Sequence, residues 1–263
     1  MLSMLLTKLV ATALVVIGVS VTVARLGPRL GGILAGTPIV LGPGYFFMLQ
    51  EQSAEFVRSA VLSTLHALVA TLLFSSCYVI AAARLGPLGS LGLATLCWIP
   101  AAFLFSLLPG DIWAAVLLYI IVLAMAEGIR RALDLKQPVV VARSGWFDLL
   151  LRGLLAGLVV GVATTLAARS GPVLSGVLVG FPVGLFTIGW TLHQRYGAEV
   201  ARCTISLAQH GMLSLVAFAV VTALLVGSAP PMATFVLALL ASISVSMALF
   251  MFSRWRVRSA FSR

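Results

Sequence analysis

Residues Leu30-Gly-Gly-Ile-Leu-Ala-Gly-Thr-Pro38 return 144 positions later as Leu174-Ser-Gly-Val-Leu-Val-Gly-Phe-Pro182, and both stretches match L-x-G-x-L-x-G-x-P. When 25–74 is laid on 169–218 without a gap, 15 of 50 positions are identical. The identities include three polar pairs: Glu55 with Glu199, Arg58 with Arg202, and His66 with His210. A composition rich in leucine and alanine produces chance matches of those two residues. It does not produce matches of a glutamate, an arginine and a histidine at one constant offset. The chain therefore contains an internal duplication, which is a common construction of secondary transporters.

The composition indicates an all-α polytopic membrane protein. The chain has 263 residues, of which 61% are hydrophobic and 9% charged, with a mean hydropathy of +1.15. Several apolar runs reach the roughly 20 residues that a helix needs to cross a bilayer. The net charge of +10 fits the basic cytoplasmic loops of such proteins. It therefore points to the lipid bilayer as the partner and not to nucleic acid.

Gly and Pro punctuation divides the chain into nine predicted transmembrane segments. Four of them form repeat 1 (1–109), a linking helix and a cytoplasmic loop occupy 110–144, and repeat 2 with a basic C-terminal tail occupies 145–263. The segments are 5–25, 30–50, 55–83, 89–108, 111–128, 147–168, 173–193, 198–226 and 231–252.

The unpaired fifth segment predicts that the repeats are inverted. Four spans return the chain to its starting side, and a fifth carries it across, so the second repeat enters from the opposite face. Basic residues then gather on one side, which places the N-terminus outside and the C-terminus in the cytoplasm of a bacterial inner membrane. An alternative makes 30–50 and 173–193 re-entrant, with seven crossings and parallel repeats, but it scatters the basic loops.

The glycine–proline stretches are the first candidate site. Glycines four residues apart let helices approach closely, and the prolines break or kink the second and seventh helices. Broken helices that meet near the midplane would shape a substrate site with Gly36, Pro38, Gly180 and Pro182. The alternative is close packing with an ordinary proline kink.

The remaining candidates are the repeated polar residues. His66 and His210 fall near the bilayer centre, where they would bind or relay protons and face each other across the two-fold axis. Alternatively, each is a neutral imidazole that bonds a neighbouring helix. Glu55 with Arg58, and Glu199 with Arg202, have a spacing that allows local ion pairs. We expect these pairs either to anchor helix ends or to gate the two faces.

No enzymatic or metal-binding constellation is present, so the sequence predicts neither an enzyme nor a cofactor nor a metal site. Cys77, Cys97 and Cys203 lie in apolar runs without a Cys-x-x-Cys pattern. Asp111 and Glu127, near the two ends of the unpaired segment, are expected at the membrane interfaces.

Each half resembles the GlpM-like family of small bacterial inner-membrane proteins. The resemblance rests on Arg25 through Pro38 with Glu55, and on Gly171 through Pro182 with Glu199. It covers about four-fifths of the chain and implies a four-helix unit that is here fused to a second copy. It implies no particular substrate.

These patterns predict a secondary transporter, proton-coupled or facilitative, for a small polar or anionic solute. The alternatives are a non-transporting scaffold or accessory subunit of envelope metabolism, and a lipid translocase. A polar cavity between the repeats would favour the transporter, a dry interface the scaffold, and a groove open to lipid the translocase. A homo-oligomer is compatible with the sequence, which does not determine the oligomeric state.

Overall fold

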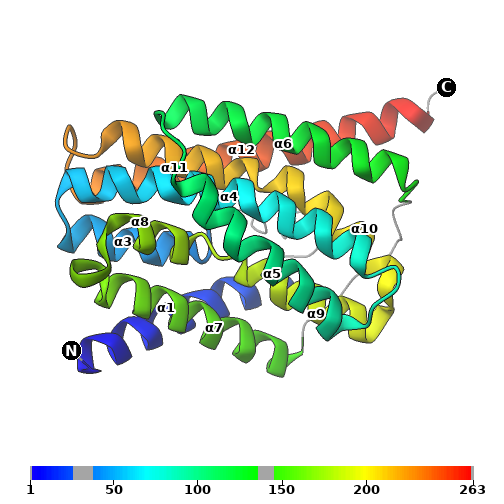
Figure 1. Cartoon of the computed structure of the whole chain (residues 1–263), viewed down its shortest axis with the longest axis horizontal. Helices are drawn as coiled ribbons and strands as arrows, with labels where there is room; N and C mark the ends of the chain where they lie inside the picture. The colour runs from blue at the N-terminus through cyan, green and yellow to red at the C-terminus, as the bar shows by residue number, and fades with distance from the viewer. Residues whose placement is uncertain (1, 26–37, 136–144, 262–263) are drawn as a thin grey trace.

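The computed structural model describes residues 2–25, 38–135 and 145–261, and these fold as an all-α protein (Figure 1). Eight stretches of helix are long and apolar enough to cross a membrane, which confirms the prediction of a multi-pass membrane protein. The helices are α1 Leu2–Arg25, α3 Leu41–Glu51, α4 Ala54–Ala81, α5 Pro87–Ser106, α6 Ile112–Ala132, α7 Trp146–Thr165, α8 Ala167–Val179, α9 Val183–Tyr196, α10 Ala198–Gly211, α11 Leu213–Leu225 and α12 Pro231–Phe261.

Helix boundaries recur at the offset of the sequence repeat. Helices α1 and α7 begin at residues 144 positions apart, and so do α4 and α10, and α5 and α12. Helices α4 and α11 end at residues 144 positions apart. Helix α6 has no counterpart, as the unpaired segment predicts. The second predicted segment, 30–50, is described only from Pro38 onward.

Local capping explains several of these boundaries. Ser53 accepts a hydrogen bond from the backbone N–H of Phe56 at the start of α4, and Asp111 does the same for Ala114 at the start of α6. Helices α5 and α12 both begin at a proline, whose missing N–H costs nothing at a first helical position.

The segment 198–226 departs from the expected single helix. It is divided into α10 and α11 at Met212, next to Gly211, whereas its counterpart α4 runs unbroken. Position 211 corresponds to Ala67 in α4, and glycine is a poorer helix former than alanine. The hydroxyl of Ser214 also bonds the carbonyl oxygen of Gly211 at 2.7 Å, which favours the bend.

Helices α1 and α7, the first helices of the two repeats, pack against each other in antiparallel directions. A β-carbon added at Gly153 would lie 2.8 Å from Ile17 and 3.2 Å from the carbonyl oxygen of Ala13. One added at Gly157 would lie 2.5 Å from the carbonyl oxygen of Leu9. Gly153 is the counterpart of Leu9 and Gly157 that of Ala13, so these contacts are reciprocal, as at a two-fold interface.

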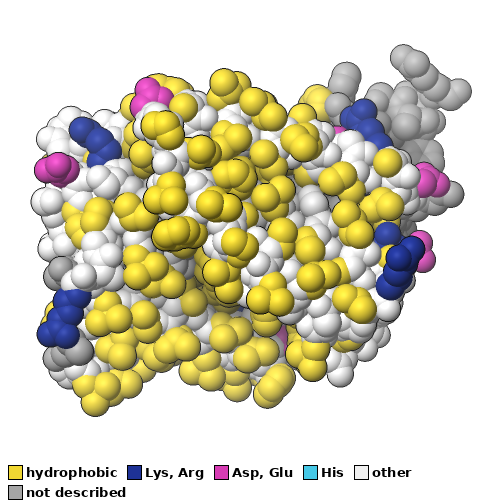
Figure 2. Space-filling model, in the orientation of Figure 1, with side chains coloured by type: hydrophobic (Ala, Val, Ile, Leu, Met, Phe, Trp, Pro, Cys, Tyr) yellow, Lys and Arg dark blue, Asp and Glu magenta, His cyan; other side chains and the backbone are white. Residues whose placement is uncertain are grey.

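The molecular surface matches a bilayer environment. Apolar side chains cover the middle of the face seen in Figure 2, and charged side chains lie mostly toward its two ends. Inside, α4 is the most deeply buried span, and Leu65, Leu68 and Leu72 of α4 share one apolar core with Phe218 of α11. The middle of the molecule is therefore well packed around α4.

Candidate functional site

The predicted break in the seventh segment is present. Helix α8 ends at Val179 and α9 begins at Val183, with Gly180, Phe181 and Pro182 between them. In the first repeat, Pro38 precedes α3, and its carbonyl oxygen accepts a hydrogen bond from the N–H of Gly42 at 2.6 Å. Gly36 lies outside the described residues, so the predicted pairing of the two breaks is described on one side only.

The glycines of α8 bring it into close contact with α4. A β-carbon at Gly176 would overlap the backbone carbonyl of Ala60, and one at Gly180 would lie 2.5 Å from the β-carbon of Ala67. The Thr64 hydroxyl donates to the carbonyl oxygen of Gly176 at 2.8 Å. Gly180 thus lies beside the middle of α4, where the packing role that we predicted for these glycines is evident.

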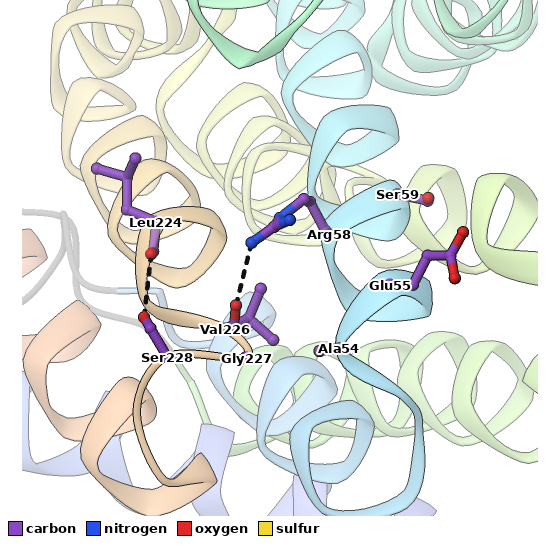
Figure 3. Close-up of a pocket in the computed structure, with 8 residues that line it drawn as sticks. All are labelled: Ala54, Glu55, Arg58, Ser59, Leu224, Val226, Gly227 and Ser228. Carbon is purple, nitrogen blue, oxygen red and sulfur yellow. Dashed lines mark hydrogen bonds between the residues drawn. The ribbon is translucent and has the colours of Figure 1, made fainter.

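A pocket of about 430 Å³ opens at one end of the molecule, between the start of α4 and the turn after α11 (Figure 3). Two of the predicted gating residues line it, Glu55 and Arg58, together with Ser59 on the next turn. Both charged side chains are exposed. The opposite wall is formed by Leu224, Val226, Gly227 and Ser228.

The two gating arginines do not form the local ion pairs that we expected. Arg58 donates to the carbonyl oxygen of Val226 at 3.2 Å, and Figure 3 shows Glu55 pointing away from it. In the other repeat, Arg202 donates to the carbonyl oxygen of Val79 at 2.7 Å. Each arginine therefore binds the C-terminal end of a helix in the other repeat, where exposed carbonyls and the helix dipole favour a cation.

One face of α4 leads from the pocket to His66. Glu55, Ser59 and His66 are spaced i, i+4 and i+11, so they lie along one stripe of the helix. The His66 side chain is 5% exposed, and its Nδ1 has no hydrogen-bond partner among the described residues. An unpartnered buried imidazole about 10 Å beyond Ser59 is a candidate proton or solute site.

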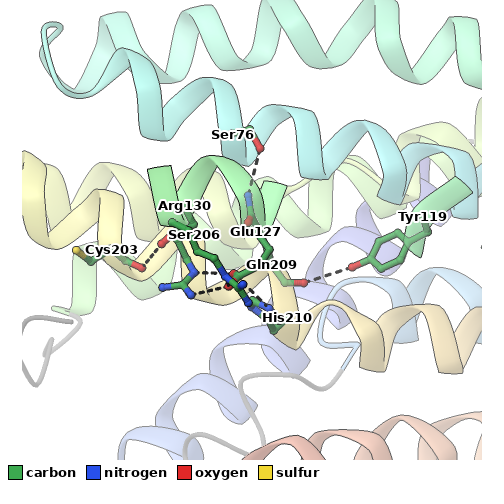
Figure 4. A network of polar contacts seen from close by, with 9 residues as sticks. Ser76, Tyr119, Glu127, Arg130, Cys203, Ser206, Gln209 and His210 are labelled. Carbon is green, nitrogen blue, oxygen red and sulfur yellow. Dashed lines mark hydrogen bonds and ion pairs between the residues drawn. The ribbon is translucent and has the colours of Figure 1, made fainter. Parts of the chain in front are cut away.

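The equivalent stripe of α10 is Glu199, Cys203 and His210, with Ser206 in the position of Leu62. Here the stripe meets the unpaired helix α6 (Figure 4). The carboxylate of Glu127 accepts two hydrogen bonds from Arg130, at 2.6 and 2.7 Å, and lies 3.7 Å from Nε2 of His210. Arg131 donates to the same carboxylate at 2.7 Å.

Beside Arg130, side chains of α4, α6 and α10 pack closely. A narrow crevice beside Arg130 is lined by Ser76, Ser206 and Gln209, and it has no room for a water molecule. Cys203 is 2% exposed, whereas its counterpart Ser59 lines the open pocket. Position 59 is therefore more accessible than its counterpart 203, whereas Glu55 and Glu199 are both exposed and His210 is more exposed than His66.

The two histidines do not face each other. Bonds from Arg58 to Val226 and from Gln209 to Ser76 set α4 antiparallel to α10 and α11. This register places His66 level with Phe218, eight residues from His210, or about 12 Å along the helix. In this register, positions 144 residues apart meet near Ala70 and Ser214, and not at the two histidines.

No protein-family model, curated protein or solved structure matches this chain. The resemblance to the GlpM-like family thus stays a prediction. Within the ranges that the structure describes, no three His, Cys, Asp or Glu side chains come together as they would at a metal centre. The candidate site therefore has to be interpreted from its own geometry.

Sequence reasoning missed the role of Glu127, Arg130 and Gln209. We expected Glu127 at the membrane interface, but the sequence did not predict that its side chain, 17% exposed, lies against α10. An acidic residue in an apolar segment with arginines three and four positions later was the available signal. The partnership with His210 depends on tertiary packing, which a sequence pattern does not specify.

Proposed function

We propose that this protein is a secondary transporter with a 4+1+4 inverted repeat and alternating access. Matched helix boundaries and the reciprocal contacts between α1 and α7 support the inverted repeat. Nine spans require 30–50 to cross the membrane, which places the two ends of the chain on opposite sides, as they lie in Figure 1.

The observation that carries this proposal is the unequal access of equivalent residues. Ser59 lines the open pocket, whereas its counterpart Cys203 is 2% exposed. A transporter with inverted repeats needs this asymmetry, because exchanging the two conformations of the repeats moves the opening from one face to the other.

Loop charge supports an orientation for this conformation. Arg84, Arg130, Arg131 and Arg195 lie at or near helix ends that gather on the side opposite the pocket (Figure 1). The positive-inside rule places that side in the cytoplasm, so the pocket would open outside a bacterial inner membrane. Arg58 in the pocket favours a small polar or anionic solute.

A second candidate, a non-transporting scaffold or accessory subunit, is favoured by one observation. The contact between α4 and α11 is filled by Leu65, Leu68, Leu72 and Phe218. A permanently dry centre would serve assembly and not passage of a solute. The two functions differ in whether the packed half ever opens.

Thiol labelling tests the proposal without knowledge of the solute. In a Cys77→Ser, Cys97→Ser background, we expect Ser59→Cys to react rapidly with a membrane-impermeant maleimide from outside intact cells or oriented vesicles. Native Cys203 should react slowly, and from the cytoplasmic side, because its half is closed. A bulky adduct on Ser59→Cys should hold the pocket open and slow Cys203 labelling further, by at least tenfold.

Leu104→Cys, an exposed position on α5, is the matched control because it lies outside both stripes. Its labelling should not respond to an adduct at position 59. If Cys203 never reacts in the folded protein, or reacts at the same rate with and without that adduct, alternating access is rejected in favour of the scaffold.

A further inference from the structure

Arg130 lies between two acceptors of different kinds. On one side it holds Glu127 with two short hydrogen bonds. On the other it lines the crevice that contains Gln209, whose side chain is buried and whose Oε1 has no hydrogen-bond partner among the described residues. A buried amide oxygen without a donor is costly, so it favours a state in which a donor reaches it.

The orientation of this amide follows from its neighbours. Ser76 donates its hydroxyl hydrogen to the carbonyl oxygen of Leu72 at 2.9 Å, so its oxygen can only accept. The Gln209 group 3.4 Å from that oxygen must therefore be the NH₂ group. This assignment leaves Oε1 as the open acceptor in the crevice beside Arg130.

His210 controls the charge balance at Glu127. With a neutral imidazole, one carboxylate faces two guanidinium groups, those of Arg130 and Arg131. Protonation of His210 adds a third cation 3.7 Å from Oε2, the oxygen that accepts from Nε of Arg130. The imidazolium then competes for that oxygen and repels the guanidinium.

Among the helices that surround His210, α6 supplies the charged side chains near it. Helix α11 and the described side chains of α12 carry no ionisable group, and α4 presents Ser76. His193 and Arg195 lie in the last turn of α9, and Glu199 and Arg202 lie in the first turns of α10. All four are therefore near the end of α10 that is opposite His210. The His210 side chain is 42% exposed.

We propose that protonation of His210 transfers Arg130 from Glu127 to the Oε1 atom of Gln209, and that this exchange opens the α10 half of the protein. Helix α6 is thus the coupling element, and the coupling ion is a proton carried on His210 at the carboxylate of Glu127. This inference rests on the proposed function and adds the ion, its site and the movement that it drives.

The test is the pH dependence of Cys203 labelling in purified protein that has Cys77→Ser and Cys97→Ser. Each rate is divided by that of the same cysteine in unfolded protein at the same pH, which removes thiol ionisation. We expect labelling to be about tenfold faster at pH 5.5 than at pH 8, as the proposed protonation of His210 requires. His210→Gln should be slow at both pH values.

Two substitutions of Gln209 test whether its Oε1 atom is the second acceptor for Arg130. Gln209→Leu should abolish the tenfold ratio, because Arg130 then has no alternative partner. Gln209→Glu should label rapidly at both pH values, because its carboxylate holds Arg130 permanently. The matched control His193→Gln, in the last turn of α9, should keep the full ratio.

A tenfold ratio that persists in His210→Gln would overturn the inference, as would slow labelling of Gln209→Glu at both pH values. The outcome is separable from the proposed function. If an adduct on Ser59→Cys slows the labelling of Cys203 but this labelling does not depend on pH, the protein is a transporter whose coupling does not involve His210.

Discussion

Gly176→Ala should destabilise the folded protein by about 3 kcal/mol. The added β-carbon would overlap the backbone carbonyl of Ala60, which cannot move away as a flexible side chain can. Forcing α8 away from α4 costs roughly 1–3 kcal/mol in overpacking, and the Thr64 bond to the Gly176 carbonyl is worth about 1 kcal/mol. Unfolding of the purified protein by titration with a denaturing detergent measures the change.

Gly184→Ala is the matched control for this prediction. A β-carbon at Gly184, in the first turn of α9, has no neighbour within 4 Å. Alanine is the better helix former by about 1 kcal/mol, so stability should stay constant or rise slightly. Equal losses in both variants would show that the close approach of α8 to α4 does not limit stability.

Glu127→Gln should open the closed half at every pH. The substitution removes the carboxylate that holds Arg130, Arg131 and His210, and it leaves Arg130 largely buried without a counter-charge. Hydrogen bonds to charged groups contribute roughly 1.5–3 kcal/mol each. A loss of about 2 kcal/mol shifts a two-state equilibrium roughly 30-fold, so Cys203 labelling should rise by about that factor.

Arg131→Gln is the control on the same carboxylate. The Arg131 side chain is 73% exposed, and solvent screening makes an exposed ion pair worth little. Labelling of Cys203 should change less than twofold. A large effect of Arg131→Gln, or none of Glu127→Gln, would remove α6 from the mechanism.

The fold features that repeat in the sequence were predictable. The 144-residue offset, the glycine and proline punctuation and the apolar runs gave the described helix boundaries and the break at Gly180 to Pro182. Each of these depends on local chemistry: capping, proline geometry or hydrophobic length. The patterns did not predict the division between α10 and α11, the start of α8 at Ala167, or the continuation of α12 to Phe261.

The side-chain partnerships were less predictable. The expected Glu55–Arg58 pair is replaced by a bond from Arg58 to Val226, which is 168 positions away. The expected meeting of His66 and His210 fails because sequence symmetry fixes which positions are equivalent but not where the axis crosses. The contact of Glu127 with His210 was not predictable because it depends on how α6 packs against α10.

The contact between α1 and α7 makes the two halves of the chain complementary and no longer interchangeable. Leu9, Ala13 and Ile17 in the first half stand where the second half has Gly153, Gly157 and Gly161. In a pair of identical first halves, Leu9 would meet Ala13 in place of Gly157, and the helices would have to separate. In a pair of second halves, glycines would face each other, and the contacts of the larger side chains would be lost. Each half therefore fits the other better than it would fit a copy of itself.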